Sequence, residues 1–402
     1  MSLSTLPISY CTNVHPGRTI AEIDEGLTRY TMPMRKAFGK PVAAGLWLAN
    51  SVVREMLADR AAMQAFISRL GERSLSCHTL NAFPYGDFHS ERVKENVYLP
   101  DWTDPRRRSY TEGCADILIA MLPLGGEGSI STVPLGFKGP EGFNRSDDFR
   151  DRCCEQLVEL AKYLGRRFKE TGKLIRIAIE PEPLCMLETT AEAVAFFRQL
   201  YYVADANRSV DVVNTHIGVC YDVCHQAVEF EDIAASIDML DSTRFPDWAP
   251  NGGRIRINKV HISCAIRMEN GSAAAREALR SFIEPRYLHQ TLARSSDGQI
   301  ARWMDLDERI LRDPPAQFVN APEWRVHFHV PIDAENLGPL GTTRSAIGEA
   351  LSAVKQLSYA PHLEVETYTW NVLPGAAKVD LVEGLSRELR AADELIARAN
   401  QA

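Results

Sequence analysis

The chain has 402 residues, of which 45% are hydrophobic and 24% are charged, and its formal net charge is -8. This composition is ordinary for a globular protein, and the negative charge argues against nucleic acid or another polyphosphate as the main ligand. The length permits two or three small domains, or one (β/α)8 barrel with long insertions.

No stretch approaches the ~18 consecutive apolar residues of a membrane span, and the N-terminus lacks the basic and apolar regions of a signal peptide. The nine cysteines are odd in number and include no CxxC pair. We therefore expect a cytoplasmic protein without membrane contact, in which the cysteines fill the core as free thiols. Cys220 and Cys224 flank an acidic residue, and a role as soft metal ligands is the alternative for these two.

Short apolar segments alternate with segments of helical periodicity along the chain. Strands are predicted at residues 7–11, 41–49, 74–80, 128–136, 174–180, 216–222, 255–262, 325–329 and 362–366. Helices are predicted at residues 18–38, 51–70, 105–122, 147–171, 189–206, 229–240, 343–357 and 378–400. The alternation predicts an α/β fold, a (β/α)8 TIM barrel with a parallel sheet. The strands exceed the eight places of a barrel by one, so we expect either 7–11 or 41–49 to open it.

The stretch 264–324 is too long for a plain connection between a strand and a helix. It leaves the C-terminal end of the sixth strand in this count, so we expect an insertion that lies over the C-terminal face as a lid. The whole chain, 1–402, is otherwise interpreted as a single barrel domain. The aromatic loop 83–102 is either a second cover or a contact surface in a homo-oligomer. Residues of the insertion with binding character are Tyr287, His289, Gln290, Arg294 and Trp303.

Residue types that bind metal ions stand at the ends of five consecutive predicted strands. They are Glu180, Asp222 with His225 three residues later, His261, His329 and Glu366. Because the C-terminal ends of parallel strands meet at one barrel mouth, these side chains should converge there. A single histidine or glutamate at a strand end is usually structural, but five in succession favour a divalent metal site.

Alternation along the strands predicts which side chains point into the barrel. The uppermost inward layer is expected to contain Glu180, His261 and Glu366. Lys259 and Glu364 fall in the layer beneath, and they are predicted to form an ion pair because a lone buried charge is costly. Arg176 has the same inward phase, so it requires a partner deeper in the barrel.

The order of these residues resembles the xylose isomerase-like TIM-barrel superfamily, which includes sugar-phosphate isomerases, ketose epimerases and an apurinic-site endonuclease branch. EP at 180–181 followed by ET at 188–189 is similar to the signature of its fourth strand, and YDVCH at 221–225 is similar to that of its fifth. Segments that resemble a metabolite-traffic branch from ebo-type gene clusters are YCTNVHPG at 10–17, YLHQ at 287–290 and HLEVETYTW at 362–370.

The resemblance implies a set of metal ligands, namely Glu180, Asp222, His261 and Glu366. It also implies that Glu180 and Glu366 are the acid and base that move a proton at a carbon next to a carbonyl. His225 would contact the substrate or a second metal ion. The chain departs from one-metal epimerases at His327 and His329, which resemble the Asp-x-His of the endonuclease branch with His in place of Asp. His78 suits the same multi-zinc pattern.

We therefore expect one to three divalent ions, either zinc, which the imidazoles favour, or manganese. The residues expected to bind the substrate are His78, Asn81, His225 and His327. The first functional hypothesis is a metal-dependent isomerase or epimerase that acts on a sugar or sugar-phosphate-like small molecule. The alternatives are a multi-zinc phosphoester hydrolase and a metabolite carrier that keeps the metal cup without turnover.

Overall fold

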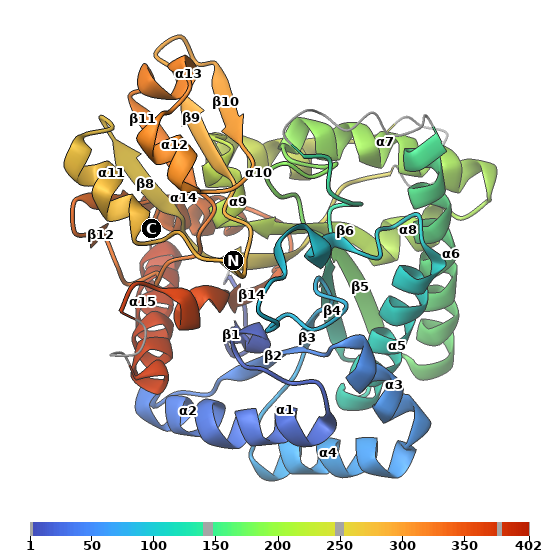
Figure 1. Cartoon of the computed structure of the whole chain (residues 1–402). Coiled ribbons are helices and arrows are strands. Elements are labelled where there is room, and N and C mark those ends of the chain that lie inside the picture. The colour runs from blue at the N-terminus through green and yellow to red at the C-terminus, as the bar shows by residue number, and fades with distance from the viewer. Residues whose placement is uncertain (1–2, 140–147, 246–252, 376–379, 402) are drawn as a thin grey trace.

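Eight parallel strands close into a barrel in the computed structural model, which describes residues 3–139, 148–245, 253–375 and 380–401. Figure 1 shows the ring of strands enclosed by helices. The barrel is closed by Ser9, which pairs with Glu364 of the last strand on one side and with Ala43 on the other. The barrel strands are β1 (Ser9–Cys11), β2 (Ala43–Trp47), β3 (Thr79–Asn81), β4 (Glu127–Thr132), β5 (Leu174–Ile179), β6 (Ile217–Asp222), β7 (Ile257–Ile262) and β14 (His362–Val365).

The predicted strand count is corrected at one place. Both N-terminal candidates belong to the barrel, as β1 and β2, so Leu174–Ile179 is its fifth strand rather than its fourth. The surplus strand is the one predicted at 325–329. It corresponds to β11 (Glu323–Val326), which pairs antiparallel with strands outside the barrel. Local alternation is the same in both settings, so only the pairing partners reveal which sheet a strand joins.

The helices around the barrel lie where helical periodicity predicted them, with two short additions, α8 and α9. Their bounds are α1 (Ile20–Gly26), α2 (Met32–Phe38), α3 (Asn50–Ala58), α4 (Arg60–Glu72), α5 (Pro105–Met121), α6 (Asp148–Thr171), α7 (Thr190–Ala206), α8 (Val210–His216), α9 (Val223–Val228), α10 (Ile233–Ser242), α14 (Ser345–Val354) and α15 (Leu381–Gln401). A π-helical turn, η2 (Leu27–Thr31), joins α1 to α2, and the remaining short turns are η1 (Thr12–Val14), η3 (Lys94–Tyr98) and η4 (Tyr368–Val372). The predicted helix starts at 147 and 378 lie outside the described residues. The last helix, α15, packs on α2 and completes the outer layer.

Two of the helices begin at residues whose side chains cap the helix N-terminus. Thr189 and Glu192 form a capping box at the start of α7, in which each side chain accepts a hydrogen bond from the other residue's backbone N–H. Pro105 occupies the first turn of α5, behind the cap residue Asp104. These motifs fix where the chain turns from a strand-end loop into a helix, and therefore how the loops at the barrel mouth are held.

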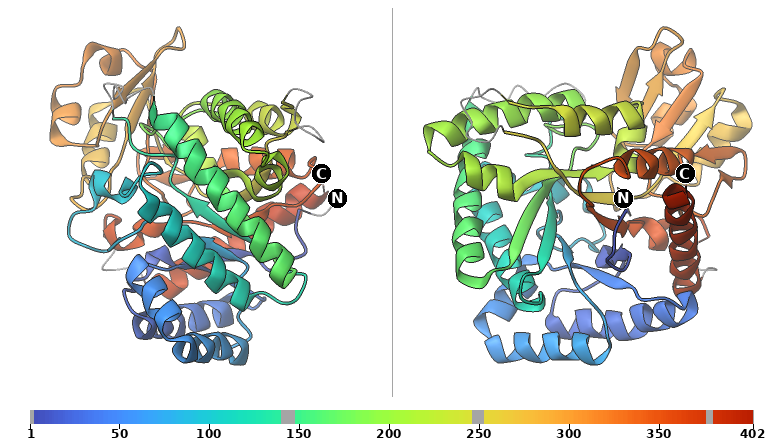
Figure 2. Two further views of the ribbon diagram at one scale, coloured as in Figure 1. Left: turned by 90° about the vertical axis from the view of Figure 1, so that its right-hand side faces the viewer. Right: turned by 180° about the vertical axis from the view of Figure 1, so that it is seen from behind.

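A second sheet lies between β7 and α14 and forms a lobe beside the barrel (Figure 2). Its strand order is β10-β9-β11-β8-β13-β12. The lobe follows the barrel strand Ile257–Ile262, the strand after which the insertion was expected, although this strand is the seventh of the barrel rather than the sixth. The last lobe strand ends at Thr342, so the lobe extends beyond the predicted bounds 264–324. Its other elements are β8 (Ile266–Glu269), α11 (Ala273–Arg280), β9 (Thr291–Arg294), β10 (Ile300–Trp303), α12 (Glu308–Arg312), α13 (Ala316–Val319), β12 (Asn336–Leu337) and β13 (Leu340–Thr342).

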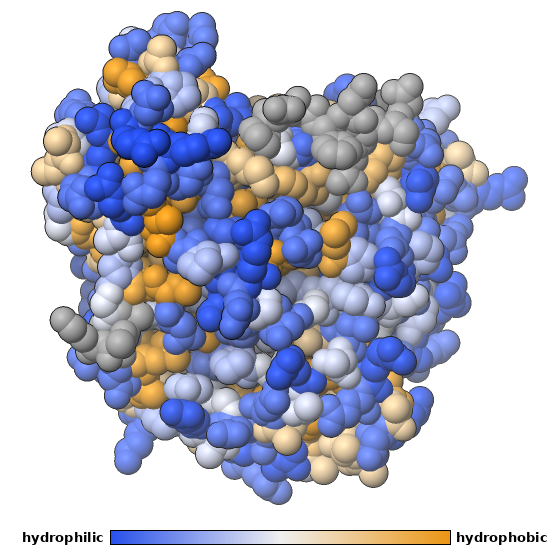
Figure 3. Space-filling model, viewed as in Figure 1, coloured by the Kyte–Doolittle hydropathy of each residue, from blue (hydrophilic) through white to orange (hydrophobic). Residues whose placement is uncertain are grey.

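The surface and the core have ordinary polarity. The face seen in Figure 3 is mostly hydrophilic, with apolar patches beneath the lobe. All nine cysteines are buried and none forms a disulfide, as the sequence predicted. Cys220 and Cys224 each lie within 4.8 Å of two other possible metal-binding side chains, so the alternative role of these two stays open. Within the described ranges, no helix has the length and apolarity needed to cross a membrane.

Candidate metal centre

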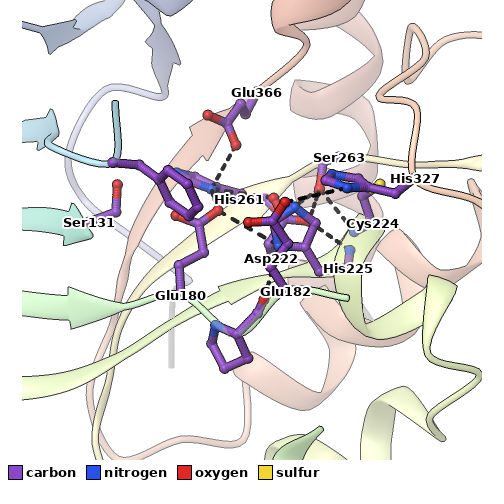
Figure 4. A network of polar contacts seen from close by, with 12 residues as sticks. Ser131, Glu180, Glu182, Asp222, Cys224, His225, His261, Ser263, His327 and Glu366 are labelled. Atoms are coloured by element: carbon purple, nitrogen blue, oxygen red, sulfur yellow. Dashed lines mark hydrogen bonds and ion pairs between the residues drawn. The ribbon is translucent and has the colours of Figure 1, made fainter. Parts of the chain in front are cut away.

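Four side chains meet at the mouth of the barrel, each carried by the end of a strand. Glu180 and Glu366 directly follow β5 and β14, Asp222 ends β6, and His261 lies near the end of β7. His261 Nδ1 lies 3.0 Å from Glu180 Oε1, 3.3 Å from Asp222 Oδ2 and 2.9 Å from Glu366 Oε2. Figure 4 shows the three carboxylates converging on this imidazole. The convergence predicted for the parallel strand ends is therefore present.

The charge of this group fits a divalent cation. Three buried carboxylates surround one Nδ1, which can donate only one hydrogen. Glu180 Oε2 and Asp222 Oδ2 are buried without a hydrogen-bond partner, and uncompensated buried charges cost several kcal/mol. One ligand atom from each residue lies within 4.8 Å of the others. A cation at their common point would satisfy all four, and oxygen and imidazole ligands suit zinc, manganese or magnesium.

The predicted ion pair lies directly beneath this group. Lys259 Nζ is 2.5 Å from Glu364 Oε2, and both side chains are fully buried. Burial raises the pKa of the Glu364 carboxyl, but the ammonium of Lys259 outweighs burial and lowers this pKa to about 2. Glu364 Oε2 is also 3.2 Å from His261 Nε2. A carboxylate behind a ligand histidine orients the ring, so Glu364 aims Nδ1 of His261 at the three acids.

A glycine in the neighbouring strand makes room for Glu364. A Cβ atom on Gly45 of β2 would lie 1.4 Å from Glu364 Oε1 and 2.8 Å from Ser9 Oγ. Ser9 donates its hydroxyl to the same Oε1 at 2.9 Å. The carboxylate therefore fills the space above Gly45, and no side chain larger than hydrogen can occupy this position without moving it.

The partner that Arg176 required is Glu127, whose Oε1 lies 2.6 Å from Arg176 Nε. Glu127 begins β4, so this pair is at the opposite end of the barrel from the metal centre. The inward charge is thus compensated as predicted.

A second group of ligand atoms adjoins the first and shares Asp222 with it. Its other members are His225, from the start of α9, and His329, which follows β11 in the lobe. His225 Nδ1 lies 3.0 Å from the backbone carbonyl of Pro181, and His329 Nδ1 lies 2.9 Å from that of Glu366. A carbonyl oxygen only accepts, so each Nδ1 carries the proton that it donates. The two Nε2 atoms then face each other at 3.4 Å. Two lone pairs at this distance repel unless a cation or an added proton lies between them.

The electrostatics of Asp222 agree with this arrangement. Burial raises the pKa of its carboxyl, but the neighbouring His225 and His329 lower the pKa well below its ordinary value.

His225, His327 and Glu182 form a further group within 4.8 Å. Glu182 is buried and accepts the Tyr98 hydroxyl at 2.7 Å, so it belongs to the site although it lies beyond the strand.

Three of the four expected substrate contacts are at the mouth, namely His225, described above, Asn81 and His327. Asn81, at the end of β3, donates to Glu366 Oε1 at 2.9 Å. His327 Nδ1 is 2.6 Å from Gln290 Oε1, and its Nε2 is buried without a partner. His78 is the exception. It precedes β3, and its ring lies 4.8 Å from that of His362, the first residue of β14.

The expectation that His78 contacts a substrate at the mouth is therefore wrong. The sequence placed the end of a strand at residue 80, whereas the barrel strand only begins at Thr79. A shift of this kind moves a residue from the C-terminal end of a strand to its N-terminal end, across the whole barrel.

Several site residues were missed by sequence reasoning. Asn13, in the turn after β1, donates to Glu366 Oε1 at 2.8 Å beside Asn81. Lys94 and Tyr368 also line the cavity above the metal centre. Asn13 lies within the YCTNVHPG segment, and its place after a barrel strand could have identified it. Tyr368 likewise lies within the HLEVETYTW segment, just after the last barrel strand, and could have been identified in the same way. Lys94 comes from η3, for which the sequence has no comparable signal.

The cavity above the centre is small. Its volume is about 50 Å³, which holds a few water molecules. The loop after β3 and the lobe narrow it: Phe88, Lys94 and Tyr98 line it from one side, and Tyr287 and Leu288 from the other. Of the lobe residues singled out in the sequence, Tyr287 reaches the cavity directly and Gln290 contacts Tyr98 and Glu182.

No protein-family model matches the chain, and no curated protein matches it. Among solved structures, it is similar to a D-allulose 3-epimerase from Methylomonas sp. with 15% identity, a TM-score of 0.48, and coverage of 98% of this chain and 99% of that one. It is similar to an L-ribulose 3-epimerase with 13% identity and a TM-score of 0.48, covering 100% and 96%. It is also similar to a xylose isomerase-like TIM barrel protein from Mycobacterium smegmatis in complex with magnesium, with 12% identity and a TM-score of 0.49, covering 99% of each chain.

These neighbours are xylose isomerase-like barrels and sugar epimerases, the kinds of protein that the sequence motifs resemble. The strand order, register and ligand geometry define the chain as a (β/α)8 barrel with a candidate metal centre at its carboxyl-terminal mouth.

Proposed function

We propose that the protein is a metal-dependent isomerase or epimerase that acts on a sugar-like small molecule. The observation that carries the proposal is the pair of carboxylates, Glu180 and Glu366, which line one cavity and both lie within 3.0 Å of His261 Nδ1. Acid–base transfer at a carbon next to a carbonyl requires two such groups at one substrate carbon.

A divalent ion held by these residues would polarise the carbonyl and hydroxyl of the substrate. Glu180 would remove the proton from the neighbouring carbon, and Glu366 would return one. Asn13 and Asn81 both donate to Glu366 Oε1, which holds this carboxylate in place and leaves Oε2 directed at the centre. The carboxylate that moves the proton is therefore preorganised by two neutral amides.

The lining favours an uncharged polyol over a sugar phosphate. Three acids, Glu180, Glu182 and Glu366, face the cavity. Among the lining residues, Lys94 brings an ammonium, but its Nζ already binds Asp305 Oδ2 at 2.7 Å and two backbone carbonyls of the lobe. A phosphate dianion would find no free cationic side chain in this lining.

We propose that the lobe, including residues 264–324, acts as a lid. The cavity of about 50 Å³ is too small for a monosaccharide, so the substrate enters only if the cover moves. The lobe is tied to the barrel rim by Arg302 of β10, whose guanidinium is 2.9 Å from Glu188 Oε2 and 2.7 Å from Glu229 Oε2. Opening would separate Arg302 from both side chains.

The test is the exchange of solvent deuterium into a panel of unphosphorylated ketoses and aldoses in the presence of excess manganese or zinc. The labelled sugars are then analysed by NMR. Wild-type protein should label the carbon next to the carbonyl. Glu180→Gln and Glu366→Gln should slow labelling by about a hundredfold to ten-thousandfold, with bound metal measured on the same samples. Glu335→Gln is the matched control, because Glu335 is 75% exposed and pairs only with Arg344 among the contacts described. Exchange that is unchanged in both site variants would rule out the assigned roles.

A multi-zinc phosphoester hydrolase is the second candidate, supported by the facing Nε2 atoms of His225 and His329. Elemental analysis separates the two: one ion per chain favours the isomerase, and two or three ions favour the hydrolase. His329→Asn should remove one ion only in the second case. A bound ion without any proton exchange would instead support a metabolite carrier. The buried free thiols support a reducing, cytoplasmic location for any of these.

A further inference from the structure

A second pocket lies at the opposite end of the barrel from the metal centre. It has a volume of about 750 Å³, within the range of small-molecule sites. The pocket is lined by residues at or just before the starts of four barrel strands, namely His78, Glu127, Arg256 and His362. Ser4 to Pro7 form part of its wall. The N-terminal end of such barrels ordinarily serves stability, so a pocket of this size needs another explanation.

The polar floor of the pocket has a buried imidazole nitrogen without a partner. His78 is 5% exposed, and its Nδ1 has no hydrogen-bond partner. His362 packs edge-on against it and uses its own Nδ1 for Ser129 Oγ at 2.8 Å. A buried imidazole nitrogen without a partner is unfavourable, and a ligand atom in the pocket would satisfy it.

The same floor has an uncompensated positive charge. Arg176 and Arg256 share one carboxylate, Glu127, at 2.6 Å and 4.0 Å. The weaker partner, Arg256, has a buried Nε without a hydrogen-bond partner. Its guanidinium stacks 3.7 Å from the centroid of the Tyr359 ring, which fixes its position. Two guanidiniums against one carboxylate leave one positive charge that is held in place.

Much of the remaining wall of the pocket is apolar. It includes Leu70, Leu75, Met121 and Leu122, together with Leu6, which is 43% exposed. A ligand that fits both parts carries one anionic group and a short apolar body.

We propose that this pocket is a second ligand site, which binds a small amphipathic anion, a carboxylate or a phosphate monoester, with its charged group at Arg256, His78 and His362. The metal centre at the other end of the barrel takes no part in it.

Two substitutions test the site from different directions. Arg256→Gln removes the fixed charge. Gly71→Met, on α4, fills the pocket: Gly71 lines it, and a Cβ there would meet no heavy atom within 4 Å. Methionine also favours a helix over glycine, so this variant should fold at least as well as wild type. Gly348→Met is the matched control, because Gly348 is also helical with open space at its Cβ but lies in α14, away from the pocket.

Octanoate and octyl phosphate are the probes, with octanol as the uncharged control, and binding is measured by calorimetry on the metal-loaded full chain. We expect one site per chain for at least one anion in wild type and Gly348→Met, and no detectable binding in Gly71→Met. Arg256→Gln should weaken binding by about tenfold to a hundredfold. The two anions distinguish a carboxylate from a phosphate site. The proposal is overturned if neither anion binds, if octanol binds as tightly, or if Gly71→Met binds like wild type.

Discussion

The ion pair beneath the metal centre allows a double-mutant test. Lys259→Met and Glu364→Leu each leave one charge fully buried without its partner, and breaking a buried pair in this way costs about 3–5 kcal/mol. At about 2.1 cal/mol/K of unfolding entropy per residue, 402 residues correspond to roughly 0.8 kcal/mol per degree. Each single variant should therefore lower Tm by about 5 °C. The double variant should recover most of the loss, because removing both charges from a dry site is roughly neutral.

Measurements of metal affinity distinguish the role of Glu364 from that of Lys259. Glu364 contacts His261 Nε2 at 3.2 Å, whereas Lys259 has no such contact among those described. Glu364→Leu and the double variant should thus bind the metal about tenfold to a hundredfold more weakly, and Lys259→Met should not. Unfolding is followed by circular dichroism and affinity by titration against a chelator. Single variants that cost less than about 1 kcal/mol, or a double variant as unstable as the two losses summed, would refute the assigned role of the pair.

Three further predictions concern Gly45 beneath the metal centre and the contact of Arg302 with Glu229 at the barrel rim. Gly45→Ala forces Glu364 from its place, so it should lower both Tm and metal affinity in the same assays. Gly39→Ala cannot serve as its control, because the positive φ of Gly39 strains any other residue at that position. Burial and the nearby Glu188 raise the pKa of Glu229 to about 8, so the folded state keeps a proton that the unfolded state releases above pH 4.5. Between pH 4.5 and 8 this group makes the unfolding free energy fall as pH rises, by at most about 1.4 kcal/mol per pH unit, and Glu229→Gln should remove that slope in urea titrations. Arg302→Ala should speed hydrogen exchange in β9 and β10 but not in α15; equal exchange in β9 and β10 would contradict the role of Arg302 at the rim.

The arrangement of the centre explains why it is buried and charged at once. Four strand ends supply the candidate ligands, and a separate layer, Lys259 with Glu364, supports them from below. Asn13 and Asn81 support Glu366 from the side. Each carboxylate is thus held by a different element, and the geometry depends on the closed barrel rather than on any single loop.

The sequence by itself determined the barrel class, the convergence of four strand-end side chains and the ion pair beneath them. Each of these depends on a period of two along a strand and on residue type at the strand end, and both can be read locally. Glu180, Asp222, His261 and Glu366 converge for that reason, as do Lys259 and Glu364.

Tertiary structure alone decided what depends on pairing between distant segments. Residues 323–326 have a strand pattern but join the lobe, because their partners are β8 and β9 rather than barrel strands. His329 reaches the centre from that lobe, and His78 lies at the far end because β3 begins only at Thr79. Strand register and the choice of sheet are set by hydrogen bonds between segments far apart in the chain, and local periodicity does not contain them.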